Sequence, residues 1–238
     1  MAIRVAVETT HATVRVALAE GSGDRWRLRE LRVEPLAAGA SMDQPLRAAL
    51  KRLRVRGSVK AIGIIPREEV IWRVIKFPTA QDEELVQMVQ LYGTAQLPYP
   101  KEQAVVDHVL LEQREGFSTV AIVACRRDML QRHLAPLQAA GLHVERLTVS
   151  SSGVLGWYAA AAQKMRVPEP ALIINHDGER TDLVLVGGGR LLLSRSIGPG
   201  AAESQAADAF EAMAHEIEQS LSTLRKELPA VEVRSLVL

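Results

Sequence analysis

The feature that most constrains the fold of this 238-residue chain is a strand–turn–strand unit that occurs twice. In each copy two apolar strands flank a short polar turn, and a third strand, a helix and a final strand follow. The first copy is expected to have strands at residues 3–8, 13–19, 27–33 and 59–65 and a helix at 42–53. The second copy is expected to have strands at 171–175, 181–186, 190–196 and 231–238 and a helix at 201–227. A duplicated β-β-β-α-β order predicts an α/β protein with two related lobes.

A different pattern lies between the two copies. Strands are expected at residues 70–77, 104–111, 119–124 and 143–149, with helices at 81–96 and 127–140. This β-α-β-β-α-β order predicts an α+β subdomain inserted into the first lobe. A helix at 151–164, with Ser150 or Ser151 as its N-cap, then leads to the second lobe. The expected domains are a first lobe of residues 1–69 and 150–168, an inserted subdomain of 70–149, and a second lobe of 169–238.

Composition and hydropathy favour a cytoplasmic protein. No segment approaches the roughly 18 consecutive apolar residues of a membrane span, and we expect no signal peptide because the first residues already resemble a strand. The single cysteine, Cys125, excludes an internal disulfide and suits a reducing compartment. Because Cys125 ends the apolar run 120–124, we expect a buried structural thiol and not a nucleophile.

Positive charge is concentrated in one segment. Residues 25–60 contain ten Lys or Arg against three Asp or Glu, although the net charge of the whole chain is +1. The simplest interpretation is a solvated sheet face and helix flank. The alternative is a surface for an acidic partner or an anionic membrane leaflet. Nucleic acid is not expected as a partner, because no aromatic residues that would stack on bases are interleaved with these charges.

A series of short motifs runs along almost the whole chain. They are Ile65-Pro66, Val70-x-x-Arg73-x-Ile75-x-Phe77-Pro78, Glu84-Leu85, Leu97-Pro98, Val106-Asp107, residues 120–124, Ala140-Gly141-Leu142, Asp182-Leu183, Gly188-x-Arg190-Leu191-x-x-Ser194-Arg195-Ser196-Ile197 and Glu216-Ile217-x-x-Ser220-Leu221. In their order and spacing these motifs resemble PilM, the actin-like family of type IV pilus assembly. The resemblance implies the actin-like (ribonuclease H-like) fold, with duplicated lobes and an inserted subdomain. The cytoplasmic domains of GspL-type secretion proteins share this plan.

The resemblance further implies a non-catalytic cytoplasmic scaffold at the inner face of the inner membrane. Family members bind the short N-terminal tail of PilN, an inner-membrane protein, against the inserted subdomain. Through PilN, family members connect the periplasmic alignment complex to the cytoplasmic assembly platform and its motor ATPase. Here the tail would lie along the 81–96 helix, the 97–100 turn and the strand near residue 105. The residues expected to line this groove are Leu85, Met88, Tyr92, Leu97, Pro98, Tyr99, Val105 and Asp107.

Many family members hold ATP between the lobes, in two phosphate turns of the pattern Asp-x-Gly. Aspartate organises Mg²⁺ there, and glycine lets the backbone approach the phosphates. The matching residues are Glu8, Thr9, Thr10 and His11 in the first turn and Asn175, Asp177, Gly178 and Thr181 in the second. Glu8 replaces an aspartate, Thr10 replaces a glycine, and Asp177 would repel a phosphate at about 4 Å by an energy on the order of several kcal/mol. We therefore expect no bound cofactor, with ATP and Mg²⁺ as the disfavoured alternative. We also expect a second lobe that is reduced or truncated before its adenine-binding turn.

Two other functional classes compete with the scaffold. A nucleotide-binding ATPase or sugar-kinase relative would need a catalytic aspartate, and the candidate, Asp107, has neighbours typical of a strand. A filament- or dimer-forming cytoskeletal protein is neither supported nor excluded. The six histidines lack metal-ligand spacing, so no metal site is expected. His11 and His176 occupy equivalent turn positions across the expected cleft, and we expect polar turn residues there, with a pH-sensitive or metal contact as the alternative.

Overall fold

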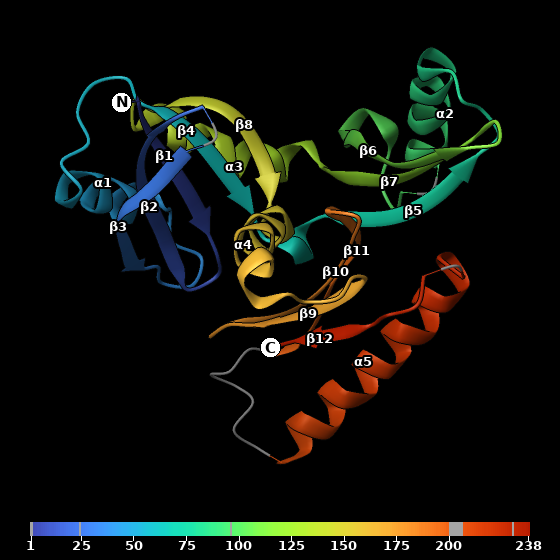
Figure 1. Cartoon of the computed structure of the whole chain (residues 1–238). Helices are drawn as coiled ribbons and strands as arrows, with labels where there is room; N and C mark the ends of the chain where they lie inside the picture. The colour runs from blue at the N-terminus through green and yellow to red at the C-terminus, as the bar shows by residue number, and fades with distance from the viewer. Residues whose placement is uncertain (1, 24, 96, 200–206, 230) are drawn as a thin grey trace. The chain divides into compact units, whose positions relative to one another are not determined.

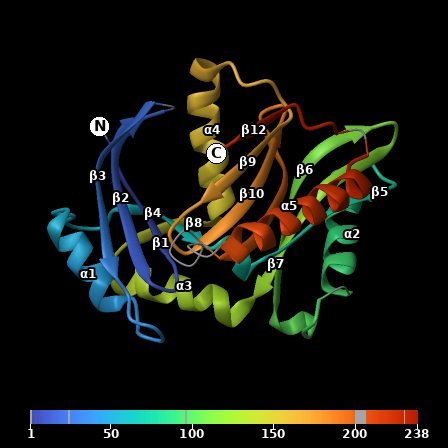
Figure 2. The same ribbon diagram turned by 90° about the horizontal axis from the view of Figure 1, so that it is seen from below.

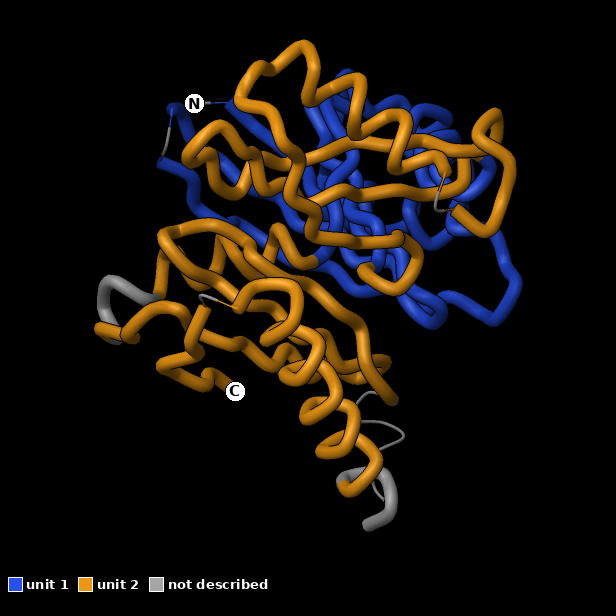
Figure 3. Tube along the Cα trace, turned by 90° about the vertical axis from the view of Figure 1, so that its right-hand side faces the viewer, with its two compact units in different colours: residues 1–66, 128–150 blue, residues 67–127, 151–238 orange. Residues whose placement is uncertain are grey.

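The computed structural model describes residues 2–23, 25–95, 97–199, 207–229 and 231–238 (Figure 1). The chain divides into two compact units (Figure 3). Unit 1 comprises residues 1–66 and 128–150, and unit 2 comprises residues 67–127 and 151–238. Within the described ranges, no helix has the length and hydropathy that crossing a membrane requires.

Unit 1 is built on a five-stranded sheet of order β3-β2-β1-β4-β8. Its elements are β1 (Ala2–Thr9), β2 (Thr13–Ser22), β3 (Arg25–Pro35), α1 (Asp43–Arg52), β4 (Lys60–Ile65), α3 (Arg127–Ala139) and β8 (His143–Val149). Alternation along β1 and β2 turns Val5, Val7 and Val16 to one face, because successive side chains of a strand point to opposite sides. There they are buried with Leu46 of α1 and Leu137 of α3. One apolar face of the sheet therefore holds unit 1 together.

The second lobe in unit 2 is a four-stranded sheet between two helices. Its strands are β9 (Ala171–His176), β10 (Arg180–Gly187), β11 (Arg190–Pro199) and β12 (Ser235–Val237), in the order β11-β10-β9-β12. Figure 2 shows α4 (Ser150–Met165) and α5 (Ala207–Glu227) on opposite faces of this sheet. Tyr158 of α4 packs on Ile173 and Val184, and Leu224 of α5 packs on Leu172 on the other face. Both faces are buried, which explains why these strands are continuous apolar runs.

The remainder of unit 2 is a small insertion in which one helix covers a three-stranded sheet of order β5-β7-β6 (Figure 1). Its elements are η1 (Arg67–Glu69), β5 (Ile71–Phe77), α2 (Asp82–Ala95), η2 (Lys101–Gln103), β6 (Ala104–Arg114) and β7 (Phe117–Arg126). Helix α2 starts where Thr79 Oγ1 accepts the Gln81 backbone N–H at 3.1 Å and donates to Glu84. Leu85 and Val89 of α2 are then buried against the sheet.

The duplication predicted from the sequence is confirmed. The strand order β11-β10-β9-β12 repeats the order β3-β2-β1-β4, with antiparallel pairing within each hairpin and parallel pairing to the fourth strand. Gly23, Gly188 and Gly189 have positive φ angles in the hairpin turns β2–β3 and β10–β11. The last strand is shorter than predicted, because only residues 235–237 of the expected 231–238 pair with β9. Residues 201–206 of the expected long helix lie outside the described ranges.

The insertion is smaller than the predicted 70–149. Strand β8 pairs parallel with β4 in unit 1, and Leu137 of α3 and Leu142 lie in the core of unit 1. The segment β4–insertion–α3–β8 is thus a parallel crossover interrupted by residues 67–127, and the order of elements alone does not reveal which sheet β8 joins. Helix α4, which we assigned to the first lobe, groups with unit 2 from Ser151 onward because Tyr158 packs on the second sheet.

Candidate functional site

The first hairpin turn is closed by Thr10. The Thr10 side-chain oxygen lies 2.9 Å from Thr13 Oγ1 and accepts the Thr13 backbone N–H at 3.0 Å. The Thr10 backbone N–H donates to the Thr13 carbonyl at 2.9 Å. Thr10 is 7% exposed, so its hydroxyl is buried and stabilises the turn from within. A glycine at this position would instead leave the backbone open to a ligand.

The carboxylate before this turn already has a cationic neighbour. Arg15 stands opposite Glu8 in the β1–β2 register, and Arg15 Nη1 donates to Glu8 Oε2 at 3.1 Å. The next residue, Thr9, has its hydroxyl 3.4 Å from Met42 Sδ. The turn therefore presents an ion pair where a phosphate turn presents a lone aspartate that organises Mg²⁺.

The second turn is capped by its own aspartate. Asp177 Oδ1 accepts the backbone N–H groups of Glu179 at 2.7 Å and Arg180 at 3.0 Å, and the Asp177 N–H donates to the Arg180 carbonyl at 3.0 Å. Backbone N–H groups of a turn are the donors that usually cradle a phosphate. Here a carboxylate takes two of them, so Asp177 competes with an anion both by charge and by hydrogen bonding.

Two other predicted residues of this turn point to opposite faces of the sheet. Thr181 is fully buried, its Oγ1 lies 2.7 Å from His176 Nδ1, and Met213 of α5 lies on the same side. Asn175 stands opposite Asp182 and so shares the α4 face of the sheet. The predicted Asn175, Asp177, Gly178 and Thr181 therefore lie in one hairpin without converging on a single point. The two turns belong to different units, and the proximity of His11 and His176 stays a prediction.

These observations test whether the turns suit Mg-ATP. In place of the Asp-x-Gly pattern, the first turn has a Glu8–Arg15 ion pair and a Thr10 hydroxyl that bonds within the turn. The second turn has the Asp177 carboxylate bound to its own backbone N–H groups. The residues of the two turns therefore do not suit a bound Mg-ATP. No set of three or more His, Cys, Asp or Glu suited to a metal occurs in the described part of the chain.

A buried polar cluster not anticipated from the sequence lies between the insertion and the second sheet. Arg67, in η1, donates from Nε to Ser194 Oγ at 2.8 Å, from Nη2 to the Ser194 carbonyl at 2.5 Å and from Nη1 to the Val70 carbonyl at 2.7 Å. Ser151 of α4 also hydrogen-bonds to Ser194, so its side chain serves this cluster and not as the predicted N-cap. Burial lowers the pKa of Arg67 to about 10, with Asp182 opposing the shift and Arg195 reinforcing it, so the guanidinium stays charged at neutral pH.

Asp182 is the acidic member of this region. It is 1% exposed, and its Oδ1 has no hydrogen-bond partner among the described residues. Burial raises the pKa of the Asp182 carboxyl above its ordinary 3.8, while a hydrogen bond with Ser196 and the charges of Arg180 and Arg67 oppose the rise. Arg180 itself pairs with Glu68 of η1. This cluster ties η1 to strands β10 and β11.

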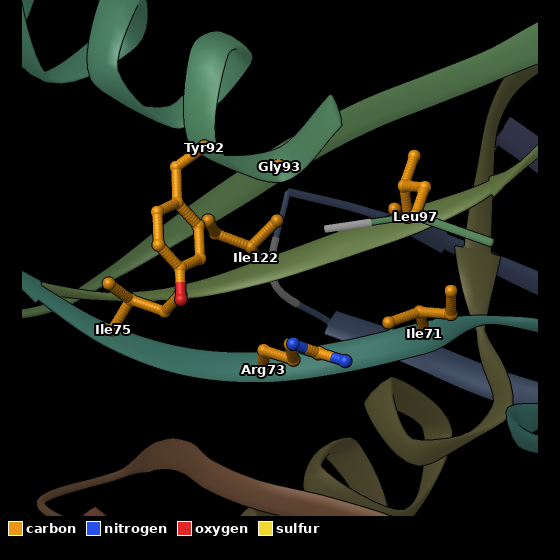
Figure 4. Close-up of a pocket in the computed structure, with 8 residues that line it drawn as sticks. Ile71, Arg73, Ile75, Tyr92, Gly93, Leu97 and Ile122 are labelled. Carbon is orange, nitrogen blue, oxygen red and sulfur yellow. The ribbon is translucent and has the colours of Figure 1, made fainter. Parts of the chain in front are cut away.

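A small pocket lies on the α2 face of the insertion sheet (Figure 4). Tyr92 descends from α2 beside Ile122 of β7, and Arg73 extends along β5 toward Ile71. The residues that line it are Ile71, Arg73, Ile75, Tyr92, Gly93, Leu97, Ile122 and Ala124. Gly93 permits the close approach of α2, because a Cβ there would lie 2.8 Å from Val106 Cγ1. The result is an apolar slot with one guanidinium at its edge.

Only some of the residues predicted for the groove reach this pocket. Tyr92 and Leu97 line it, whereas Leu85 is 2% exposed and, like Met88, belongs to the core beneath α2. Pro98 is exposed, and Tyr99 stacks loosely with Arg126, whose Cζ is 6.0 Å from the ring centroid.

Two predicted groove residues, Val105 and Asp107, lie on the wrong side of the sheet. Their neighbour Val106 packs under α2, and because side chains alternate along a strand, Val105 and Asp107 face the other way. Sequence reasoning missed Ile71, Arg73 and Ile75, although their alternate spacing on one strand already placed them on a common face.

The charge of Arg73 also affects a carboxyl group outside the pocket, that of Glu227. Burial raises the pKa of the Glu227 carboxyl near the end of α5, and the charges of Arg73 and Arg195 oppose that rise. Tyr92 is held edge-on to Phe77, with ring centroids 5.9 Å apart and planes at 83°. The aromatic ring at the pocket is therefore positioned by a neighbour outside it.

Comparison with known proteins identifies the family and the fold. A family model described as type IV pilus assembly protein PilM matches residues 7–169, and no curated protein matches the chain. The chain is similar to a structure of the PilM-PilN type IV pilus biogenesis complex, with 22% identity and a TM-score of 0.70 over 96% of this chain and 72% of that chain. The cytoplasmic domain of EpsL, an inner membrane component of the type II secretion system of Vibrio cholerae, gives 12% identity and a TM-score of 0.58 over 82% and 71%.

A Bacteroides thetaiotaomicron protein with an actin-like ATPase fold gives 11% identity and a TM-score of 0.55 over 99% of this chain and 90% of that chain. At these identities the similarities establish the fold, which is actin-like, as predicted from the sequence. The family model spans more than half of the chain. The chain therefore belongs to the PilM family of type IV pilus assembly proteins.

Proposed function

We propose that this protein is a non-catalytic scaffold of a type IV pilus machine that binds the N-terminal tail of a PilN-like inner-membrane protein. The observation that carries the proposal is the apolar pocket between α2 and the insertion sheet, in a chain of the PilM family. In the related complex the partner of PilM is PilN. The proposed setting is the cytoplasmic face of the inner membrane, reached through that partner.

The chemistry of the pocket supports a short peptide as the ligand. Ile71, Ile75 and Leu97 offer contacts to aliphatic side chains, and Tyr92 adds an aromatic surface that is 37% exposed. Buried aromatic and aliphatic anchors supply most of the binding energy in peptide grooves. Arg73 provides one cation for a carboxylate or a peptide carbonyl. Residues 85–100 carry no charged side chain, which is typical of a protein-binding surface.

The two hairpin turns support the non-catalytic part of the proposal. Glu8 is paired with Arg15, and Asp177 holds its own turn, so neither carboxylate is arranged for Mg²⁺ and a nucleotide. Asp107, the candidate base of a kinase, is exposed on a strand and accepts the N–H of His108 at 2.8 Å. Apart from the shared fold, none of the described residues at these turns or at Asp107 favours an actin-like ATPase or sugar kinase.

The experiment is a calorimetric titration of the whole chain with a synthetic N-terminal tail of the PilN-like partner. Tyr92→Ala is expected to weaken binding at least tenfold, because truncation of a central aromatic anchor commonly costs about 2 kcal/mol. Leu91→Ala is the matched control, since Leu91 is the adjacent residue of α2, is 76% exposed and does not line this pocket.

Three results would count against the proposal. Equal losses in both variants would place the tail elsewhere, and no binding to the tail would remove the core of the claim. Binding of the N-terminal domain of a motor ATPase without any tail would favour a GspL-like adaptor, the runner-up suggested by the similarity to EpsL.

A further inference from the structure

We infer that unit 1 binds an anionic phospholipid surface directly, through the basic end of its five-stranded sheet. The two units differ sharply in charge. Residues 1–66 and 128–150 contain fourteen Lys or Arg against eight Asp or Glu, a net charge of +6. Residues 67–127 and 151–238 contain fifteen against twenty, a net charge of −5. A chain with this asymmetry is oriented by a negative surface, which attracts unit 1 and repels unit 2.

The register of the sheet gathers the basic segments at one end. Lys60, Arg4, Ala19 and Leu28 form one row across β4, β1, β2 and β3. The first residues of β3 and the loop that leads from α1 into β4 therefore lie at the same end of the sheet, the end at which Figure 1 shows the N-terminus. The hairpin turn 9–12 lies at the opposite end.

Four basic side chains on the segments that start at this end or lead to it are exposed and have no acidic partner within the described residues. They are Arg25 and Arg27 on β3, and Arg54 and Arg56 in the loop between α1 and β4. Other bases of the same segment are neutralised, in the pairs Arg29–Glu20, Arg32–Glu30, Arg52–Glu34 and Lys60–Glu145. Of the other two bases, Arg47 donates to the Ala139 carbonyl at 3.0 Å, and Lys51 adjoins Arg52, whose partner Glu34 lies at the other end of β3. The four arginines are therefore the charges at this end that are available to an external anion.

The type of residue and its surroundings favour lipid headgroups over an acidic protein. All four bases are arginines, whose planar guanidinium binds phosphate through two parallel hydrogen bonds. A protein interface would instead pack its apolar centre into a pocket, and both described pockets lie on the insertion.

The strength of the interaction follows from the number of charges. Each Lys or Arg near an anionic leaflet increases the partition coefficient about fivefold at moderate ionic strength. Removal of two bases is therefore expected to reduce binding about 25-fold. Because exposed charges are screened over roughly 10 Å at 0.1 M salt, the binding of the native chain is expected to fall steeply as salt is raised.

The test is co-sedimentation of the whole chain with phosphatidylcholine vesicles that contain about one third phosphatidylglycerol. Arg25→Gln with Arg27→Gln, and separately Arg54→Gln with Arg56→Gln, are each expected to weaken binding about 25-fold. The control is Arg225→Gln with Lys226→Gln, which removes two exposed bases from α5 in unit 2 and is expected to change binding less than about twofold.

Circular dichroism and binding of the partner tail confirm that each variant is folded, and they separate this inference from the proposed function. Equal binding to pure phosphatidylcholine vesicles would overturn the inference, as would equal losses in the unit 1 and unit 2 variants. Binding to polyglutamate without binding to the anionic vesicles would overturn it in favour of an acidic protein partner.

Discussion

Arg67 and Ser194 lie 127 positions apart in the chain, and Arg67 holds both the hydroxyl and the carbonyl oxygen of Ser194. Ser151 reaches the same hydroxyl from the start of α4. The chain passes from unit 1 into unit 2 at 66/67 and at 150/151, so the residues just after both of these passages are anchored to one serine of β11. The buried cluster thus fixes the insertion and α4 to the second sheet.

Replacement of Ser194 by alanine should destabilise the protein. The substitution removes an acceptor from a buried guanidinium and a partner from Ser151, and unsatisfied buried polar groups cost about 1–3 kcal/mol each. Urea unfolding measures the loss. Ser222→Ala, at an exposed position of α5, is the control and should not destabilise. Equal stability of Ser194→Ala and the native chain would show that the cluster contributes nothing.

The buried carboxyl of Asp182 should make stability depend on pH. Its pKa is raised in the folded protein, chiefly by burial, so the folded state binds more protons than the unfolded state at pH values above the ordinary 3.8. The free energy of unfolding therefore falls as pH rises from 3.8 to the pKa of Asp182 in the folded protein, because the folded state must give up its extra proton. At higher pH the free energy of unfolding stays at the lower value.

Comparison with Asp182→Asn isolates this effect from other titrating groups. The free energy of unfolding of the native chain should fall relative to that of the variant as pH is raised from about 4 to 7. Urea titrations of both proteins at several pH values provide the measurement. A difference between the two proteins that did not change with pH, or that changed in the opposite direction, would contradict the assigned pKa shift.

Gly93 and Gly156 should respond in opposite ways to alanine, although both lie within helices. A Cβ on Gly93 would lie 2.8 Å from Val106 Cγ1 and force α2 away from the sheet, whereas a Cβ on Gly156 of α4 meets nothing within 4 Å. Overpacking at Gly93 should cost about 1–3 kcal/mol, partly offset by the helix propensity of alanine. Gly156→Ala should stabilise by about 1 kcal/mol. Thermal unfolding of the two variants gives the signs, and a stabilised Gly93→Ala would refute the close packing of α2.

Most secondary structure was predictable because the strands and helices are strongly periodic. Strand 181–186 was expected from its apolar run, and β10 spans Arg180–Gly187. Cys125 was expected to be a buried thiol, and it is 7% exposed and unbridged. The assignment of β8 to the insertion was wrong because a β-α-β order fits either sheet. The choice is made by Leu137 and Leu142, which pack into the core of unit 1.

The candidate site was less predictable. Tyr92 and Leu97, which were predicted for the groove, line the pocket, whereas Val105 and Asp107 were placed in the groove without regard to strand alternation around Val106. No local pattern links Arg67 to Ser194, since their contact depends on how the insertion packs on β11. Long-range polar contacts of this kind are set by tertiary structure and leave no periodic signal.

Addition of ATP with Mg²⁺ should leave the melting temperature unchanged. A ligand at 100 times its dissociation constant would add about 2.7 kcal/mol of stability, which a thermal shift readily detects. Neither turn presents a carboxylate and open backbone suited to the bound nucleotide. A concentration-dependent rise in melting temperature that required both ATP and Mg²⁺ would show that the turns bind nucleotide despite their residues.

The most direct test of the central claim is a methyl NMR titration of the Ile-labelled chain with the N-terminal tail of a PilN-like partner. The δ1 methyl groups of Ile71, Ile75 and Ile122 line the pocket and should shift as the tail binds. Those of Ile173 and Ile197, which lie in the core of the second sheet, should stay in place. Shifts confined to the three pocket methyl groups are the predicted result, and a saturating titration that leaves these three unmoved would contradict the account.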